Sequence, residues 1–142
     1  MSQVRHLLES KNPDVVSIAP DAPVIDALRM MADAGVGAVL VMEGKKLVGI
    51  LSERDYARKV VLLGRTSSDT PVSEIMSHQV VCGRLLDTVD QCMQVMTDKR
   101  IRHLPILEHK EVVGIVSIGD LVKAVIDQQQ VELRHLQDYI AS

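Results

Sequence analysis

One short string of chemically capable residues occurs twice in this 142-residue chain, 65 positions apart. It consists of a glycine, two apolar residues, a serine, two variable residues and an aspartate: Gly49, Ser52 and Asp55 first, then Gly114, Ser117 and Asp120. A strand glycine lets a ligand approach the backbone, and a hydroxyl beside the N–H groups of a helix start binds anions. An aspartate in that first turn can accept hydrogen bonds from both hydroxyls of a ribose. The string therefore indicates a nucleotide site.

The same spacing also has a purely structural interpretation. A serine at the N-cap with an acid three residues later forms a capping box, and an acid in the first turn suits the helix dipole. The two interpretations are compatible, because the serine can satisfy the helix while the aspartate faces a ligand. The spacing alone leaves both open.

The elements around the string repeat with the same offset, as when Val48-Gly49-Ile50 aligns with Val113-Gly114-Ile115. Short apolar runs predict strands, and apolar spacing of i, i+3, i+4, i+7 predicts helices. The expected strands are 15–18, 38–42 and 47–51, then 80–82, 103–107 and 112–116; the expected helices are 24–31, 89–96, one starting at Ser52, and a long one from Ser117 to about Tyr139. In the last helix Leu121, Val122, Val125 and Ile126 are expected to pack on the core, and the sparser apolar residues beyond them to face a partner.

These elements predict an α/β (α+β) fold of tandem repeats, each strand–helix–strand–strand–helix. We divide the chain into a first repeat, residues 1–71, and a second, residues 72–142. One repeat alone is too small to bury a stable core. We therefore expect the two to pack with pseudo-two-fold symmetry and to form two clefts between them.

Composition narrows the function further. A net charge of −3, no Phe or Trp and only two Tyr argue against nucleic-acid binding. Cys82 and Cys92 have neither zinc nor CxxC spacing, so reduced thiols are expected. The sequence shows no signal peptide and no apolar run long enough for a membrane helix. We expect a cytoplasmic protein with no membrane partner.

The repeat and its doubled motif resemble the cystathionine-β-synthase (CBS) domain pair, also called a Bateman module. Residues 102–106, Arg-His-Leu-Pro-Ile, also look like the family's strand with a proline in its middle, which we expect at a sheet edge or bulge. The resemblance covers about residues 4–130. It implies a stand-alone, bacterial-type signal-transduction protein that is not an enzyme and that binds adenine nucleotides between its repeats. AMP is the first expectation, with ADP, ATP or NAD as alternatives.

The resemblance also implies two crossed clefts, in which each motif faces the first two strands of the other repeat. The first cleft would be lined by Ser52, Arg54, Asp55, Arg58, Val80, Val81, Arg102, His103 and Leu104. The second would be lined by Lys11, Val15, Val16, Gly37, Ala38, Val39, Ser117 and Asp120. The aspartates would bind ribose, and the serines would lie near ribose or phosphate.

The clefts are expected to differ, because the cations of the first are mostly not repeated. Gly119 stands where Arg54 does, Gly37-Ala38 stands where Arg102-His103 does, and Lys123 aligns with Arg58. We expect the Asp55 cleft to hold the more anionic end of a ligand.

Two alternatives to nucleotide sensing stay open. The chain could be a ligand-independent scaffold that dimerises through exposed helix faces; a homodimer and an unidentified regulated protein are expected partners in either case. It could also be an enzyme with a His103–Cys82 nucleophile, although no third group that would orient the pair is evident.

Overall fold

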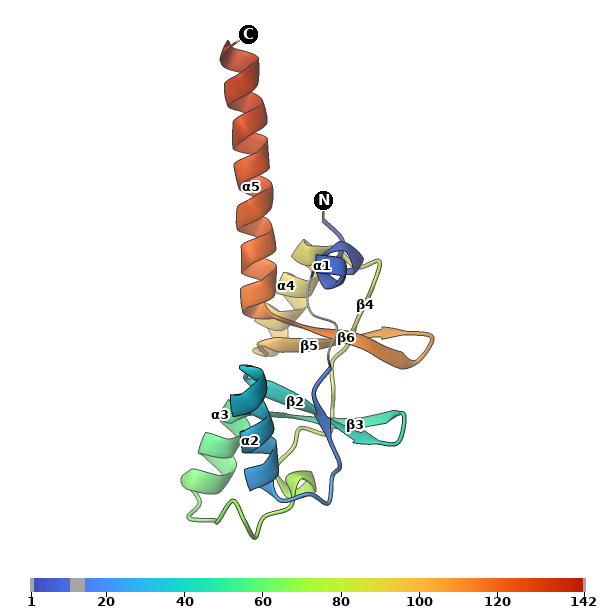
Figure 1. Ribbon diagram of the computed structural model, residues 1–142, viewed down its shortest axis with the longest axis vertical. Helices are drawn as coiled ribbons and strands as arrows, with labels where there is room; N and C mark the ends of the chain where they lie inside the picture. The colour runs from blue at the N-terminus through green and yellow to red at the C-terminus, as the bar shows by residue number, and fades with distance from the viewer. Residues whose placement is uncertain (1, 11–14, 142) are drawn as a thin grey trace. The chain divides into compact units, whose positions relative to one another are not determined.

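The computed structural model describes residues 2–10 and 15–141 (Figure 1). The helices are α1 (Val4–Ser10), α2 (Val24–Ala34), α3 (Glu53–Tyr56), α4 (Val89–Lys99) and α5 (Ile118–Ala141). The strands are β1 (Ser17–Ile18), β2 (Ala38–Glu43), β3 (Lys46–Ser52), β4 (Gly83–Arg84), β5 (His103–Glu108) and β6 (Glu111–Ser117). A π-helical segment, Ala57–Val61, continues α3, and a 3-10 turn spans Val72–Glu74.

Two three-stranded sheets carry the repeat, with strand orders β1-β2-β3 and β4-β5-β6. In each sheet a two-residue strand runs parallel to the first strand of the hairpin, and the registers correspond. Ile18 pairs with Val41 in the first sheet, and Gly83 pairs with Ile106 in the second, 65 positions on. The predicted order strand–helix–strand–strand–helix is confirmed in both copies.

The described residues form two compact units, each with its own aliphatic core. One unit consists of residues 15–81 with 109–112, and the other of 2–10, 82–108 and 113–141, so that α1 belongs with the second repeat. The first core contains Ile18, Val24, Ala27, Met31, Val39, Val41, Leu51, Val60, Val72, Ile75 and Met76. The second contains Val4, Val89, Cys92, Met96, Leu104, Ile106, Val116 and Leu121. With no Phe or Trp in the chain, close packing of aliphatic side chains must provide this stability.

The ends of α2 and α4 show why these helices span the residues they do. Pro23 is the N-cap of α2, and Thr88 caps α4 in a capping box with Gln91. Both helices end at a residue in the left-handed conformation, Gly35 (φ 67°) and Arg100 (φ 55°). The left-handed C-cap terminates each helix before its hairpin, and it fits glycine better than arginine.

The expected strand at 80–82 is wrong, because the strand is Gly83–Arg84. Gly83 lies against the Leu104 and Ile106 side chains, whereas the aligned residue of the first sheet is Ile18. A Cβ on Gly83 would come within 2.9 Å of a Leu104 methyl carbon and 3.0 Å of one on Ile106. Likewise, the strand expected at 15–18 is shortened to Ser17–Ile18, although the Val16 carbonyl still accepts a hydrogen bond from the Leu40 N–H at 3.0 Å.

Pro105 is not on an edge strand, since β5 is the middle strand of its sheet. The sheet tolerates this proline because β4 has only two residues, which pair with Ile106 and Leu107. Pro105 aligns with Leu40, whose N–H donates to the Val16 carbonyl oxygen in the first sheet, so the second sheet lacks this bond and its pairing begins one residue later, at Gly83 and Ile106. The short length of β4 therefore lets a proline occupy the middle strand of this sheet.

The long C-terminal helix is confirmed, but two of its expected core residues are wrong. Leu121 is fully buried and Val125 is half-buried, whereas Val122 and Ile126 are 41% and 48% exposed. Adjacent helix positions differ by about 100° in direction, so residues 121 and 125 share a face that 122 and 126 do not. The apolar stripe of α5 is therefore wider than the surface on which it packs.

Gly49 tests the packing of the first unit. A Cβ there would lie 2.5 Å from the Met76 Sδ and 3.0 Å from the Ser77 carbonyl oxygen. Because Met76 is buried, we expect Gly49→Ala to lower the free energy of unfolding by about 1–3 kcal/mol, measured by urea denaturation. The control is Gly119→Ala, whose Cβ would meet only the Ser117 Oγ, at 3.6 Å. Equal stability of the two variants would contradict this account of the packing.

Candidate functional site

Ser52 and Asp55 form a closed capping box at the junction of β3 and α3. The Ser52 N–H and hydroxyl donate to the Asp55 Oδ2 at 2.9 and 3.0 Å, and the Asp55 N–H donates to the Ser52 Oγ at 3.2 Å. Ser52 has the extended backbone (φ −112°, ψ 163°) of an N-cap residue. The structural interpretation of the motif is therefore confirmed in this copy.

The second copy repeats the geometry closely. The Ser117 N–H donates to the Asp120 Oδ2 at 2.9 Å, and the Asp120 N–H donates to the Ser117 Oγ at 3.1 Å. In each copy one carboxylate oxygen is fixed by the backbone, while the other lies outside the box. A carboxylate held in this way is pre-oriented to accept hydrogen bonds from a ligand.

Lys59 distinguishes the first motif from the second, and the sequence analysis missed it. Its Nζ lies 3.5 Å from the Asp55 Oδ1 and donates to the Ile75 carbonyl oxygen at 3.0 Å. The side chains of Lys59 and Asp55 are 44% and 17% exposed. The aligned position in the second repeat is Ala124, so Asp120 has no lysine four residues along its helix, and Lys123 lies three residues along. The i, i+4 spacing of Asp55 and Lys59 was the available signal.

Each motif is also bonded to the start of the middle strand of its own sheet. The N–H of Glu53 donates to the Gly37 carbonyl oxygen at 3.0 Å, and that of Ile118 donates to the Arg102 carbonyl oxygen at 2.9 Å. In addition, Ala38 is the register partner of Ser52. Within each unit, serine, aspartate and the entry of the hairpin therefore form one rigid junction.

The remaining predicted site residues differ in what they can offer a ligand. Arg54, Arg58 and Arg102 are exposed, and His103 is half-buried. Val39 and Leu104 are buried in the cores, so their strands present backbone atoms rather than these side chains. Val15, Val16, Val80 and Val81 are half-buried, and Lys11 lies outside the described residues. The predicted crossing of the two motifs onto each other's strands stays a prediction.

A groove of about 660 Å³ lies between α1 and α5 in the second unit. It is lined by Ser2, His6, Leu7, Asp120, Lys123, Ala124, Asp127, Gln128 and Val131. The Ser2 hydroxyl donates to the Gln128 Oε1 across it, at 3.2 Å. The groove places Lys123 beside Asp120, although its α1 residues were not among those predicted.

Neither thiol has the lowered pKa of a nucleophilic cysteine. Burial raises the pKa of the Cys82 thiol. Burial and the nearby Asp87 carboxylate raise the pKa of the Cys92 thiol to about 11. A nucleophilic cysteine needs a lowered pKa, because the thiolate is the reactive form. The proposed His103–Cys82 pair therefore lacks support from Cys82.

Among residues 2–10 and 15–141, no helix combines the length and apolar composition needed to cross a membrane. In the same part of the chain, no three His, Cys, Asp or Glu side chains are grouped to hold a metal ion.

Comparison with known proteins gives consistent matches. The CBS domain family matches residues 4–62 and 72–127. A mitochondrial CBS domain-containing protein of Arabidopsis thaliana is 42% identical over 125 residues, which cover 84% of this chain but only 61% of that protein. Among solved structures, a proposed signal-transduction protein with CBS domains from Burkholderia ambifaria MC40-6 is 43% identical, with a TM-score of 0.87 over 90% of this chain and 96% of that one.

A further solved structure was determined with a ligand. It is a CBS domain protein from Pyrobaculum aerophilum complexed with AMP. It is 26% identical to this chain, with a TM-score of 0.75 over 83% of this chain and 88% of that one.

Cys92 provides a test of the thiol environment. In a Cys82→Ala variant at pH 8, we expect native protein to react with iodoacetamide at least roughly a hundredfold more slowly than protein in urea. A pKa near 11 instead of 9.0 lowers the thiolate fraction by about that factor, and burial slows access further. The reaction is followed by mass spectrometry. Equal rates in the two conditions would show that Cys92 is neither buried nor protonated in solution.

Proposed function

Because the chain belongs to the CBS domain family, we propose that it is a non-catalytic regulatory module that binds an adenine nucleotide. The main support for this proposal is the serine–aspartate junction between strand and helix, which occurs in both repeats. Asp55 and Asp120 are each fixed through one carboxylate oxygen at the start of a helix, in two copies of one frame. A pair of vicinal ribose hydroxyls suits such a carboxylate, which has several acceptor sites and no donor.

We propose AMP as the ligand, with ADP, ATP or NAD as alternatives. The AMP bound by the Pyrobaculum aerophilum relative supports an adenine ligand. The composition of this chain favours binding of adenine without aromatic stacking. Without Phe or Trp, an adenine ring would lie against aliphatic side chains and backbone groups.

Two crossed clefts are part of the proposal. In the first, Asp55 and Ser52 would act with Val80, Val81 and residues 102–104. In the second, Asp120 and Ser117 would act with Lys11, Val15, Val16 and residues 37–39. The buried state of Val39 and Leu104 favours recognition of the adenine edge by the backbone of these strands.

The two sites are proposed to be unequal. Arg54, Arg58 and Arg102 are exposed cations assigned to the first site, where their guanidinium groups suit phosphate oxygens. Lys59 adds an ammonium group 3.5 Å from the Asp55 Oδ1. Since Gly119 and Ala124 replace Arg54 and Lys59, the second site would prefer a ligand, or an end of a ligand, with less negative charge.

Regulation would follow from a difference in affinity between two arrangements of the chain, because a ligand shifts only those equilibria whose states it binds unequally. The bond from Lys59 to the Ile75 carbonyl oxygen links the first motif to the end of the 3-10 turn Val72–Glu74. We propose that a cytoplasmic partner protein reads this change. A ligand-independent homodimer is the second candidate, favoured by the exposed Val122 and Ile126. Calorimetry separates the two functions when light scattering shows a dimer, because a scaffold that is indifferent to ligand binds no adenine nucleotide.

Removing the two acids tests ribose recognition. We expect Asp55→Ala and Asp120→Ala each to weaken AMP binding at one site by about 10- to 150-fold, since each loses charged hydrogen bonds, and the double variant to show no calorimetric binding at AMP concentrations that saturate the native protein. The control is Thr88→Ala, which breaks the capping box of α4, outside both proposed sites. It should lose similar stability and keep full affinity. Unchanged AMP binding in the double variant would refute the assignment of the two aspartates.

The cations give a separate test of the inequality of the sites. In an Asp120→Ala background, we expect Arg54→Ala with Arg58→Ala to weaken ATP binding at least about tenfold more than adenosine binding, because only ATP carries phosphates. Calorimetry measures both affinities. The matched control is Arg29→Ala, which removes an exposed arginine of α2 that is paired with Asp26. If ATP and adenosine lose affinity equally, the arginines do not contact phosphate.

A further inference from the structure

The exposed side of α5 carries a heptad seam. Val122, Ile126, Gln129, Leu133, Leu136 and Ile140 follow one another at spacings of 4, 3, 4, 3 and 4. Five of the six are aliphatic, and those five are 41% to 74% exposed. This spacing is that of positions a and d in a coiled coil, with Ile126, Leu133 and Ile140 at a and the other three at d. An apolar line of this length indicates a protein contact.

The seam is distinct from the face by which α5 packs in its own unit. That inner face consists of Leu121, Ala124, Val125 and Gln128, which are buried or half-buried. Val122 and Ile126 lie outside it, as their exposure shows. The seam therefore remains available after the unit has folded.

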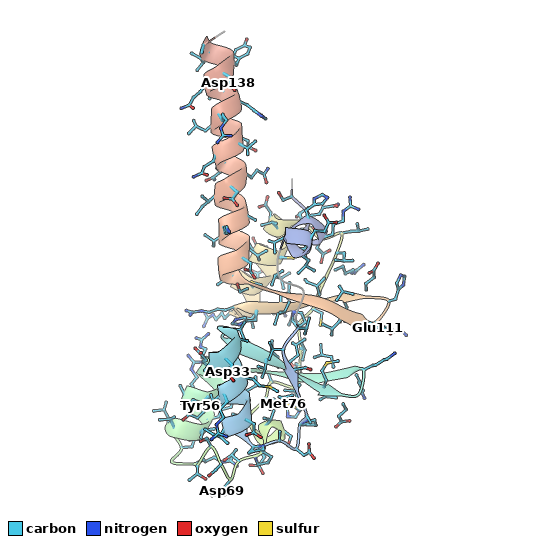
Figure 2. All side chains as sticks on the ribbon, viewed as in Figure 1. Asp33, Tyr56, Asp69, Met76, Glu111 and Asp138 are labelled. Carbon is cyan, nitrogen blue, oxygen red and sulfur yellow. The ribbon has the colours of Figure 1, made fainter. Side chains whose placement is uncertain are left out.

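Beyond Gln128 the aliphatic residues of the seam stay exposed, whereas Val131, which lies outside the seam, lines the groove beside α1. Residues 129–141 are all exposed. In Figure 1, α5 continues past α1 and α4, the other helices of its unit, and Figure 2 shows side chains around Asp138 projecting without another described element of the unit beside them. A helical stretch of about this length is marginal in water unless its apolar face is covered. The seam needs a second helix.

The residues of the seam favour a second copy of the same helix, in parallel. Ile at a with Leu at d favours two parallel strands, and Ile126, Ile140 and Leu136 follow this rule. A parallel dimer also places Gln129 opposite the same residue of the other copy, where the two amides can hydrogen-bond to each other and fix the register.

Charges beside the seam agree with this orientation. In a parallel pair, Glu132 at position g faces the neutral Gln137 at position e of the other copy. In an antiparallel pair that aligns the two seams end to end, the two Glu132 carboxylates would face each other and repel. We propose that α5 forms a parallel, two-stranded coiled coil with α5 of a second copy of this chain. This proposal does not depend on nucleotide binding.

Two pairs of variants in the full chain test the proposal. Leu133→Lys places a charge in the seam, whereas Val131→Lys places one at a similarly exposed aliphatic residue of the same helix, on the side of the α1 groove. Sedimentation equilibrium should show a dimer dissociation constant about thirtyfold weaker for Leu133→Lys and unchanged for Val131→Lys, the fold-change expected of a central contact.

Disulfide formation then tests orientation. In a Cys82→Ala background, Leu136→Cys should cross-link two chains on mild oxidation, because parallel d positions bring like residues within the short Cα separation that a disulfide needs. Val131→Cys should not. A chain that stays monomeric, a dimer that Leu133→Lys leaves intact, or failure of Leu136→Cys to cross-link would each overturn the proposal. A monomer would mean that another protein covers the seam.

Discussion

A hydrogen bond from a serine N–H to an aspartate Oδ2, 2.9 Å long in both repeats, fixes the junction on which the proposed function depends. The reciprocal bond from the aspartate N–H to the serine Oγ satisfies one of the N–H groups that a helix start leaves without a partner in the helix. The bond to Oδ2 also determines where one carboxylate oxygen lies and leaves the other outside the box. The capping box and the proposed ribose contact therefore use different atoms of the same side chain.

Duplication of this junction sets a limit on how the two halves can differ. Strand registers and capping boxes correspond in the two copies, so differences must come from residues around the junction. Lys59 against Ala124 and Arg54 against Gly119 are such differences. They change charge without changing the frame, since these positions lie on exposed or half-exposed helix faces. A duplicated fold can in this way hold two sites of unequal charge.

Much of this fold follows from the sequence, because α2, α4 and both hairpins have clear apolar periodicity and strong caps. The wrong predictions concern strand limits, burial and side-chain contacts that tertiary packing determines. The second sheet's short strand begins at Gly83, one residue later than its counterpart, because Pro105 lacks the N–H that the aligned Leu40 donates to the Val16 carbonyl oxygen in the first sheet. Val122 and Ile126 share the helical pattern of core residues, yet nothing in periodicity shows how wide a surface α5 meets. The role of Lys59 depends on the Ile75 carbonyl, which no motif reveals.

The most direct test of the central claim is mass spectrometry of small molecules released from the protein, purified in its native state without added nucleotide. The account predicts an adenine nucleotide, at no more than two molecules per chain, that is absent from protein carrying Asp55→Ala and Asp120→Ala. Release of a ligand without a ribose, or equal amounts of nucleotide from the double variant, would contradict it.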